Sequence, residues 1–280
     1  MFLLIDWGNT RLKYLLVREL VGFCAHHASQ KLEIVESVSA LLRQLELSGK
    51  KDDITQVLIA SVRSEVDNLQ LVTAMERMGL VPYIAKTSKN ACGVECAYQE
   101  PERLGIDRWL AIIAAYRTAR FDPGEEAGHP VGIIDVGSAI TLDIVNQHGM
   151  HLGGHILPGK ALLTESLLNT ANVKTKDSDA RLIFFELGRS TSDCVNLGVE
   201  QMILGYLIQC ITESSQKYQV NRWFISGGGA DYWLDMLQNN KRLSRDIGIL
   251  SEPTLVFQGL AKLYIFHHPI TDKVTMPFFT

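Results

Sequence analysis

The chain has 280 residues, with 27 lysines and arginines against 31 aspartates and glutamates and a formal net charge of −4. That length allows one large domain or two of medium size, and either can bury a sizeable core. The slightly acidic balance argues against a nucleic acid or a membrane surface as the main partner. The longest apolar runs, such as residues 109–116, are too short to span a bilayer.

The N-terminus and the cysteines indicate a cytoplasmic protein. No basic region precedes the first apolar run, and Asp6 interrupts that run early, so a signal peptide is not predicted. The five cysteines are scattered, and Cys92 and Cys96 lack the spacing of a zinc site. Buried or idle thiols in a reducing cytoplasm fit this pattern.

The first predicted element is a β-hairpin. Apolar residues 3–5 and 14–16 flank a polar turn that contains Gly8 and Asn9. Such a turn can offer backbone N–H and hydroxyl groups to phosphate oxygens while Asp6 holds a metal ion. An ordinary hairpin with a surface aspartate fits these residues equally well.

The rest of the first half predicts a mixed sheet covered by helices. A third strand completes a meander, and helices then alternate with strands. Residues 86–102 are irregular and polar, and they lead into a helix that ends near Arg120. The other expected elements are strands at 21–25, 57–60 and 81–84, a helix capped by Ser37 and a helix over 65–78.

Residues 121–130 form the clearest linker, with two prolines, two glycines and no apolar period. A second meander and a second alternation of helices and strands follow it. Two such units of similar length predict two copies of a ribonuclease-H-like domain, with the active site in the cleft between them. The second half is expected to have strands at 131–136, 140–146, 151–157, 223–226 and 247–250, and helices at 160–168, at about 192–218, from Tyr232 and at 253–266.

The second half repeats the motif of the first hairpin. Asp135, Gly137 and Ser138 again lie between two apolar strands. Paired Asp-x-Gly hairpins resemble the actin-like, hexokinase-like and sugar-kinase superfamily, in which two similar domains each contribute a phosphate-binding turn to one nucleotide. The resemblance implies an α/β fold of two ribonuclease-H-like (actin-like ATPase) domains with mixed sheets flanked by helices, residues 1–121 and 130–280.

An ordered set of further segments makes the chain similar to the type III pantothenate kinases. Ser138 stands where that family usually has threonine, which keeps the hydroxyl group, and the insert at 122–129 is slightly long. The segments that carry the resemblance are the first loop at 6–13, the pantothenate-binding and catalytic segment at 93–108, the second phosphate motif at 135–143, and residues 153–159, 188–192 and 226–231.

This resemblance implies ATP-dependent phosphorylation of the primary hydroxyl of pantothenate to 4′-phosphopantothenate, the first step of coenzyme A biosynthesis. It also implies Mg²⁺, a monovalent cation (K⁺ or NH₄⁺) and a homodimer. The sequence has neither a P-loop nor the protein-kinase motif set. We therefore expect the two Asp-x-Gly turns to bind the phosphates, because phosphoryl transfer depends on positioning and charge neutralisation.

The resemblance assigns the acceptor side of the reaction to residues 98–108. Asp107 would be the general base, since an alcohol needs an acceptor for its proton in the transition state; as an alternative, it only satisfies backbone N–H groups at a helix start. Arg108 would bind the pantothenate carboxylate, or it forms a surface ion pair. Tyr98, Gly105 and Ile106 would line the same pocket with Thr191 of the neighbouring subunit, although Tyr98 also fits a plain core position.

The nucleotide side is assigned in the same way. Asp6 would hold the Mg²⁺–triphosphate, directly or through water. Asp135 would bind the monovalent cation, with a second Mg²⁺ as the open alternative, and Asp143 is either structural or part of this cluster. Contacts to the phosphates and the adenosine would come from Gly8, Asn9, Thr10, Arg11, Lys13, Ser138 and Gly228.

Two other functions stay open on the sequence alone. Another kinase or phosphohydrolase of the superfamily, such as a sugar kinase, would keep both turns but need a different acceptor site. A non-catalytic nucleotide-binding accessory protein would not need Asp6 or Asp107, and both are present. Tyr98 together with Gly105-x-Asp107-Arg108 favours a small acidic acceptor.

Overall fold

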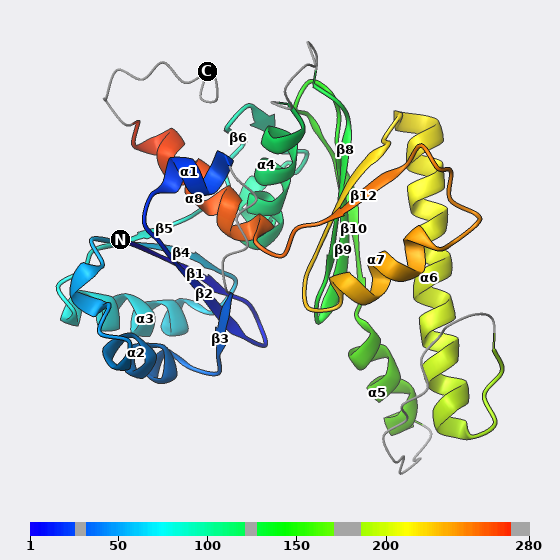
Figure 1. Cartoon of the computed structure of the whole chain (residues 1–280), viewed down its shortest axis with the longest axis horizontal. Coiled ribbons are helices and arrows are strands. Elements are labelled where there is room, and N and C mark those ends of the chain that lie inside the picture. The colour runs from blue at the N-terminus through cyan, green and yellow to red at the C-terminus, as the bar shows by residue number, and fades with distance from the viewer. Residues whose placement is uncertain (26–31, 121–127, 171–185, 270–280) are drawn as a thin grey trace. The chain divides into compact units, whose positions relative to one another are not determined.

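The computed structural model describes residues 1–25, 32–120, 128–170 and 186–269. Two five-stranded mixed sheets, each flanked by helices, make up an α/β fold (Figure 1), which confirms the predicted fold class. The chain divides into two compact units, of which the first comprises Met1–Gly128, Gln147–Gly153 and Thr254–Thr280 and the second His129–Asn146 and Gly154–Pro253. The cleft expected between them stays a prediction.

The sheet of the first unit combines a meander with two crossover connections. Its strands are β1 (Phe2–Trp7), β2 (Leu12–Val17), β3 (Glu33–Val35), β4 (Gln56–Ser61) and β5 (Pro82–Ile84). In the order β3-β2-β1-β4-β5, β2 is antiparallel to both β1 and β3, whereas β4 is parallel to β1 and β5. This is the ribonuclease-H-like arrangement that the sequence predicted.

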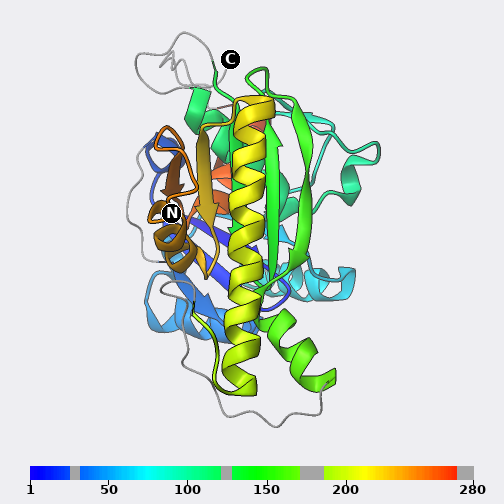
Figure 2. The ribbon, with the colours of Figure 1, turned by 90° about the vertical axis from the view of Figure 1, so that its right-hand side faces the viewer.

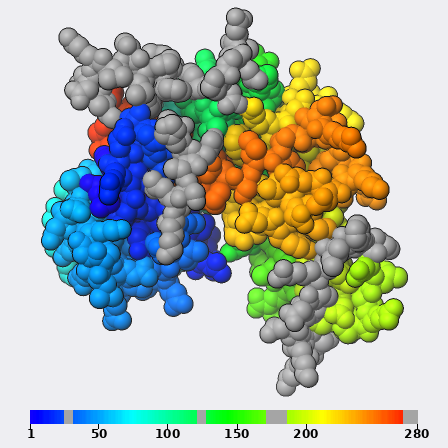
Figure 3. Space-filling view, viewed as in Figure 1, coloured from blue at the N-terminus to red at the C-terminus, as the bar shows by residue number. Residues whose placement is uncertain are grey.

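Helices cover both faces of this sheet. Leu3 and Ile5 of β1 point into a core that they share with α2 (Val38–Leu47) and α3 (Glu65–Arg77), whose outer sides form part of the surface in Figure 3. The opposite face is covered by α4 (Ile106–Arg120) and α8 (Leu255–His267), which pack against each other and against β4. These two helices cross closely at Gly259. A Cβ there would lie 2.0 Å from the Leu110 carbonyl oxygen, so a larger residue would clash with α4.

The second unit repeats the same topology. Its strands are β8 (Val131–Val136), β9 (Ala139–Val145), β10 (His151–Pro158), β11 (Arg222–Ser226) and β12 (Gly248–Ser251). In the order β10-β9-β8-β11-β12, β8 is antiparallel to β9 and parallel to β11. The helices of this unit are α5 (Lys160–Thr170), α6 (Thr191–Tyr218) and α7 (Ala230–Gln238).

Helix α6 is long and apolar enough to cross a membrane by length and composition alone. Its apolar residues have another explanation, because Ile203, Leu207 and Ile211 are buried in the core of the second unit together with residues of β8 and β9. Figure 2 shows α6 lying along this sheet.

Two predicted elements differ from the structure. Residues 21–25, expected as the third strand of the meander, belong to helix α1 (Leu20–Ala25), where Leu20 and Phe23 are buried at helical spacing; the third strand is β3, further along the chain. The segment expected to be irregular contains a small hairpin of β6 (Asn90–Ala91) and β7 (Val94–Glu95). Short 3₁₀ turns lie at Lys51–Asp53 and Pro101–Arg103.

The last helix, α8, belongs to the first unit, whereas a contiguous second domain would include it. Helix α8 packs against α4, α1 and β1 in the first unit. As a functional boundary, the division into residues 1–121 and 130–280 stays a prediction, and part of the expected linker, at 121–127, lies outside the described residues.

Candidate active site

The first phosphate turn joins β1 to β2. Asp6 lies opposite Lys13 and Trp7 opposite Leu12, so residues 8–11 form the turn. The Gly8 N–H donates to the Arg11 carbonyl oxygen at 3.0 Å and closes it. Because side chains alternate along a strand, Asp6 points away from the core that Leu3 and Ile5 enter and toward the face covered by α4 and α8.

Asp6 lies in an unusual electrostatic environment. It is 7% exposed, and burial is the main reason why its pKa is raised above the ordinary value. Lys13, whose Nζ is 3.5 Å from Asp6 Oδ2, lowers the pKa of Asp6, whereas the nearby charge of Asp107 raises it. The first phosphate turn and the start of α4 therefore bring two carboxylates within electrostatic reach of each other.

Asp107 lies in the first turn of α4. Its Oδ1 accepts a hydrogen bond from the Arg108 N–H at 2.8 Å, which is the helix-start contact given above as the alternative to a catalytic role. The same oxygen would be 2.6 Å from a Cβ at Gly105, so a larger residue there would shift this carboxylate. Asp107 is nevertheless half-buried rather than enclosed, and its role as a base stays a prediction.

Arg108 and Tyr98, both predicted for the acceptor pocket, are in contact. The Arg108 Nη1 donates to the Tyr98 hydroxyl at 3.1 Å, and its guanidinium lies 5.9 Å from the centre of the Tyr98 ring. Arg108 is buried, which does not fit a surface ion pair. Ile106, the first residue of α4, is also buried.

His151, which the sequence analysis did not single out, extends this arrangement. Its ring stacks on Tyr98 with a centroid distance of 6.4 Å and an interplanar angle of 17°. Its Nδ1 accepts a hydrogen bond from the Ala97 N–H at 3.4 Å, and the side chain is buried. Since His151 begins β10, about fifty residues after Tyr98, only the tertiary fold reveals the pair.

Arg63 is a second residue that sequence reasoning missed. Its Nη1 donates to the Asn9 carbonyl oxygen at 3.0 Å, and its guanidinium lies 5.6 Å from the centre of the Trp7 ring. Asp67 holds the other side of the guanidinium at 3.1 Å. Arg63 follows β4, and because β4 is parallel to β1 the ends of both strands meet at one edge of the sheet. That adjacency is the feature that could have indicated Arg63.

The second phosphate turn lies at the equivalent place in the second unit. Asp135 is the next-to-last residue of β8, as Asp6 is of β1, and it lies opposite Thr141 of β9 and beside Ser226 of β11. The Gly137 N–H donates to the Ala139 carbonyl oxygen at 2.9 Å. Asp143 is buried further along β9.

Two glycine segments surround this second turn. The Gly159 N–H donates to the Ser138 carbonyl oxygen at 2.9 Å, and the Gly229 N–H donates to the Val136 carbonyl oxygen at 3.0 Å. Gly227 has φ +95°, and a Cβ there would lie 2.4 Å from the Val136 oxygen, so both its conformation and the space require glycine. The structure thus brings the predicted adenosine turn, with Gly228, next to the predicted phosphate turn.

The structure gives the positions of several further predicted site residues, whose roles stay predictions. Thr10 and Arg11 are exposed in the first turn, and Thr191 opens α6 after the cap residue Ser190. Residues from the two units would have to meet around one nucleotide, and that meeting stays a prediction. Among the described residues, no group of three or more His, Cys, Asp or Glu side chains is arranged to hold a metal ion.

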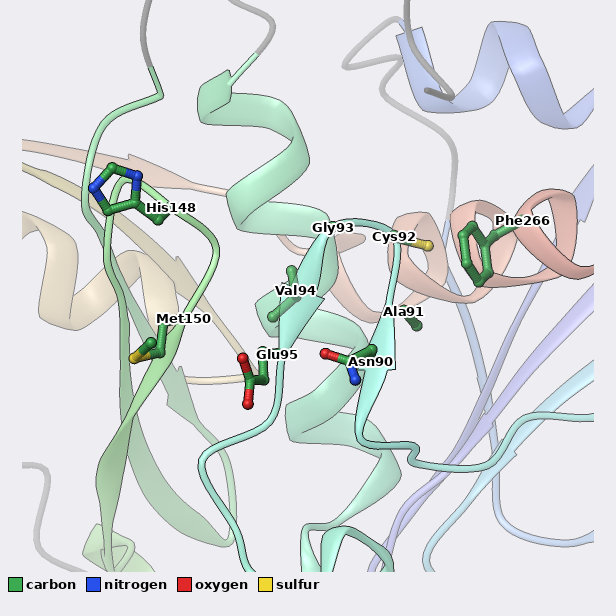
Figure 4. A pocket seen from close by; sticks show the side chains of 9 residues that line it. All are labelled: Asn90, Ala91, Cys92, Gly93, Val94, Glu95, His148, Met150 and Phe266. Carbon is green, nitrogen blue, oxygen red and sulfur yellow. The ribbon is translucent and has the colours of Figure 1, made fainter.

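A pocket of about 340 Å³ lies elsewhere on the first unit (Figure 4). The β6–β7 hairpin, the turn before β10 and the end of α8 form it. None of the individually predicted site residues lines it, although Gly93, Val94 and Glu95 belong to the start of the segment 93–108. Its lining residues are Asn90, Ala91, Cys92, Gly93, Val94, Glu95, His148, Met150 and Phe266.

Comparison with solved structures supports the fold. A Baf-family protein from Campylobacter jejuni is similar with a TM-score of 0.55 and 18% identity, over 95% of this chain and 98% of that one. The Lmo2764 protein from Listeria monocytogenes has a TM-score of 0.51 and 13% identity, over 95% and 99% of the two chains. At these identities the likeness shows the fold alone.

Comparison of sequences is more specific. A type III pantothenate kinase from Cellvibrio japonicus is 32% identical over 266 residues, covering 93% of this chain and 95% of the relative. One from Marinomonas sp. is 35% identical over 239 residues, covering 84% and 86%. The family model of type III pantothenate kinases matches residues 2–213. Together with the two phosphate turns and the acceptor segment, these matches show that the chain belongs to the type III pantothenate kinase family.

Proposed function

We propose that the chain transfers the γ-phosphoryl group of ATP to the primary hydroxyl of pantothenate, with Asp107 accepting the hydroxyl proton. The bond between the γ-phosphorus and the β–γ bridging oxygen breaks, the hydroxyl oxygen bonds to phosphorus, and ADP leaves. Family membership supports the substrates. The observation that carries the residue assignment is the position of Asp107 in the first turn of α4, next to the buried Arg108 that contacts Tyr98; its charge also raises the pKa of Asp6.

Asp6 is the residue that would hold Mg²⁺ with the triphosphate. Its pKa is raised by burial and by Asp107, so its ionised form is disfavoured unless a cation is near, and Lys13 at 3.5 Å offsets this only in part. Carboxylate oxygen is also a ligand that Mg²⁺ prefers. When bound, Mg²⁺ would neutralise charge on the triphosphate. Gly8, Asn9, Thr10 and Arg11 would contact the phosphates.

Asp135 and Ser138 would serve the second side of the nucleotide. Asp135 lies near the carboxyl end of the central strand β8, beside Ser226 of β11 and opposite Thr141 of β9, and its carboxylate would bind K⁺ or NH₄⁺ there. Ser138 would contact phosphate, and Gly228 would leave space for the adenosine.

Arg108 would bind the carboxylate of pantothenate. It is buried and its orientation is fixed by Tyr98, so little side-chain freedom would be lost on binding. Gly105 and Ile106 would complete the pocket in this chain, and Thr191 would come from a second copy in a homodimer.

The test is ADP release measured with a coupled assay, in which pantothenate is compared with a panel of sugars, other hydroxy acids and no acceptor. We expect turnover with pantothenate in the presence of ATP and Mg²⁺. Turnover of a sugar without turnover of pantothenate would instead indicate another kinase of the same fold, and ADP release without any acceptor would indicate a phosphohydrolase.

A further inference from the structure

A buried carboxylate outside the predicted site lies behind the second phosphate turn. Glu200 is on α6 and is 0% exposed. One of its oxygens, Oε1, pairs with the Nζ of Lys160, and the other, Oε2, accepts a hydrogen bond from the Tyr232 hydroxyl at 2.8 Å. A carboxylate that is removed from water needs such partners, because burying its charge alone is costly.

Lys160 connects this carboxylate to the phosphate turn. It is the first residue of α5 and directly follows Gly159. A Cβ at Gly159 would lie 2.5 Å from the Gly137 carbonyl oxygen and 2.7 Å from that of Ser138, so the backbone before Lys160 presses against the turn. A shift of Lys160 would therefore move the segment that supports Gly137 and Ser138.

Tyr232 connects the same carboxylate to the glycine turn. It lies in the first turn of α7, which begins directly after Gly227–Gly229. Gly229 donates to the Val136 carbonyl oxygen at 3.0 Å, which places the start of α7 against the end of β8. The start of α5 and the start of α7 both contact residues 136–138 through their preceding glycines, and the side chains of Lys160 and Tyr232 also connect them at Glu200.

We propose that Glu200 is a positioning residue for nucleotide binding, which holds the second phosphate turn and the glycine turn in a fixed relation through Lys160 and Tyr232. The inference rests on the proposed function in that both turns are taken as parts of the ATP site. Glu200 itself touches neither the nucleotide nor the reacting atoms. We expect the nucleoside triphosphate, rather than pantothenate, to be the ligand affected, because the contacts of Glu200 with Lys160 and Tyr232 lead to these two turns.

The test uses the full chain and the variants Glu200→Gln and Tyr232→Phe. Glutamine keeps the size of the side chain but loses its charge, and phenylalanine loses only the hydroxyl that reaches Glu200. We expect the Kd for a non-hydrolysable ATP analogue, measured by calorimetry, and the KM for ATP to rise about tenfold in Glu200→Gln and less in Tyr232→Phe. The KM for pantothenate should change less than about twofold.

Leu207→Ala is the matched control on the same helix. Leu207 is also fully buried, but in the apolar core, so its truncation lowers the melting temperature without removing a polar contact to Lys160 or Tyr232. If Glu200 were merely structural, Glu200→Gln would behave like this control, with a lower melting temperature and an unchanged Kd. An unchanged Kd in folded Glu200→Gln and Tyr232→Phe would overturn the proposal.

A double variant adds a second criterion. Lys160→Gln and Tyr232→Phe should each weaken nucleotide binding, and their combination should weaken it by less than the product of the two effects, because both act through one carboxylate. Multiplicative effects would mean that the two contacts act independently, which would contradict a joint action through Glu200. Absence of pantothenate turnover in a wild-type protein that binds the analogue normally would count against the proposed function alone.

Discussion

Replacement of Asp107 by asparagine separates its catalytic role from its structural one. Asparagine is nearly isosteric, and its Oδ1 can still accept the Arg108 N–H, the 2.8 Å contact that Asp107 makes at the start of α4. The structural cost is therefore limited to the lost charge at a helix N-terminus, about 0.3–1 kcal/mol. Asparagine cannot take up a proton, however, so a base would be lost entirely.

The expected loss in kcat is about 10²–10⁴-fold, which corresponds to roughly 3–5 kcal/mol of activation free energy. Nucleotide binding should persist, because the negative charge of Asp107 raises the pKa of Asp6. Without that charge the pKa of Asp6 moves down and the ionised carboxylate becomes easier to form. The variant is therefore expected to bind the Mg²⁺ complex of an ATP analogue at least as tightly as the wild type.

The assay is coupled ADP release at saturating ATP and pantothenate, with the Kd of the analogue measured by calorimetry. Glu65→Gln is a matched control, since Glu65 is an exposed carboxylate in the first turn of α3; its kcat should stay at the wild-type value. A kcat of Asp107→Asn within about threefold of the wild type would refute the reasoning, and Asp107 would then be only a helix-start residue.

Three further predictions concern the other charged groups. Arg108→Gln should raise the KM for pantothenate roughly 10- to 100-fold through loss of a charge-assisted hydrogen bond of ~1.5–3 kcal/mol; a rise in the KM for ATP instead would place Arg108 at the phosphates. Asp6→Asn should abolish turnover but raise the melting temperature of the nucleotide-free protein at pH 7. Folding raises the pKa of Asp6, so its carboxyl contributes stability below the unfolded pKa and loses that contribution as pH rises through the folded pKa. The gain should therefore shrink toward pH 4, and a lower melting temperature at pH 7 would contradict it. Turnover should require K⁺ or NH₄⁺, and Asp135→Asn should lose this activation; equal wild-type rates in Na⁺ buffer would rule out the proposed cation site.

The local patterns of the sequence were sufficient to predict the two Asp-x-Gly hairpins. An aspartate followed two residues later by a glycine between apolar strands predicts a hairpin, and both hairpins are present with Asp6 and Asp135 at the next-to-last position of their first strands. The duplication also predicted two copies of one domain, each a meander followed by helix–strand alternation, and the two sheets do share one topology. These features depend on neighbours in the chain, so a single sequence carries them.

Features that depend on distant segments could not be predicted in this way. The apolar run at 21–25 is too short for its period to separate a strand from a helix, and burial of Leu20 and Phe23 decides for the helix. The contacts of His151 with Tyr98 and of Arg63 with Asn9 join segments more than fifty residues apart. No spacing rule applies to such pairs.

The duplicated fold gives two equivalent carboxylates, and the residues opposite them make the two different. Asp6 lies across from Lys13 and within electrostatic reach of Asp107, whereas Asp135 lies across from the neutral Thr141. The first turn has four residues between its last paired positions, and the second has three, 137–139. A buried carboxylate beside another acid is best satisfied by a strongly charged ion. This difference supports the role proposed for Mg²⁺ at Asp6, whereas K⁺ or NH₄⁺ at Asp135 stays a proposal that the cation dependence of turnover tests.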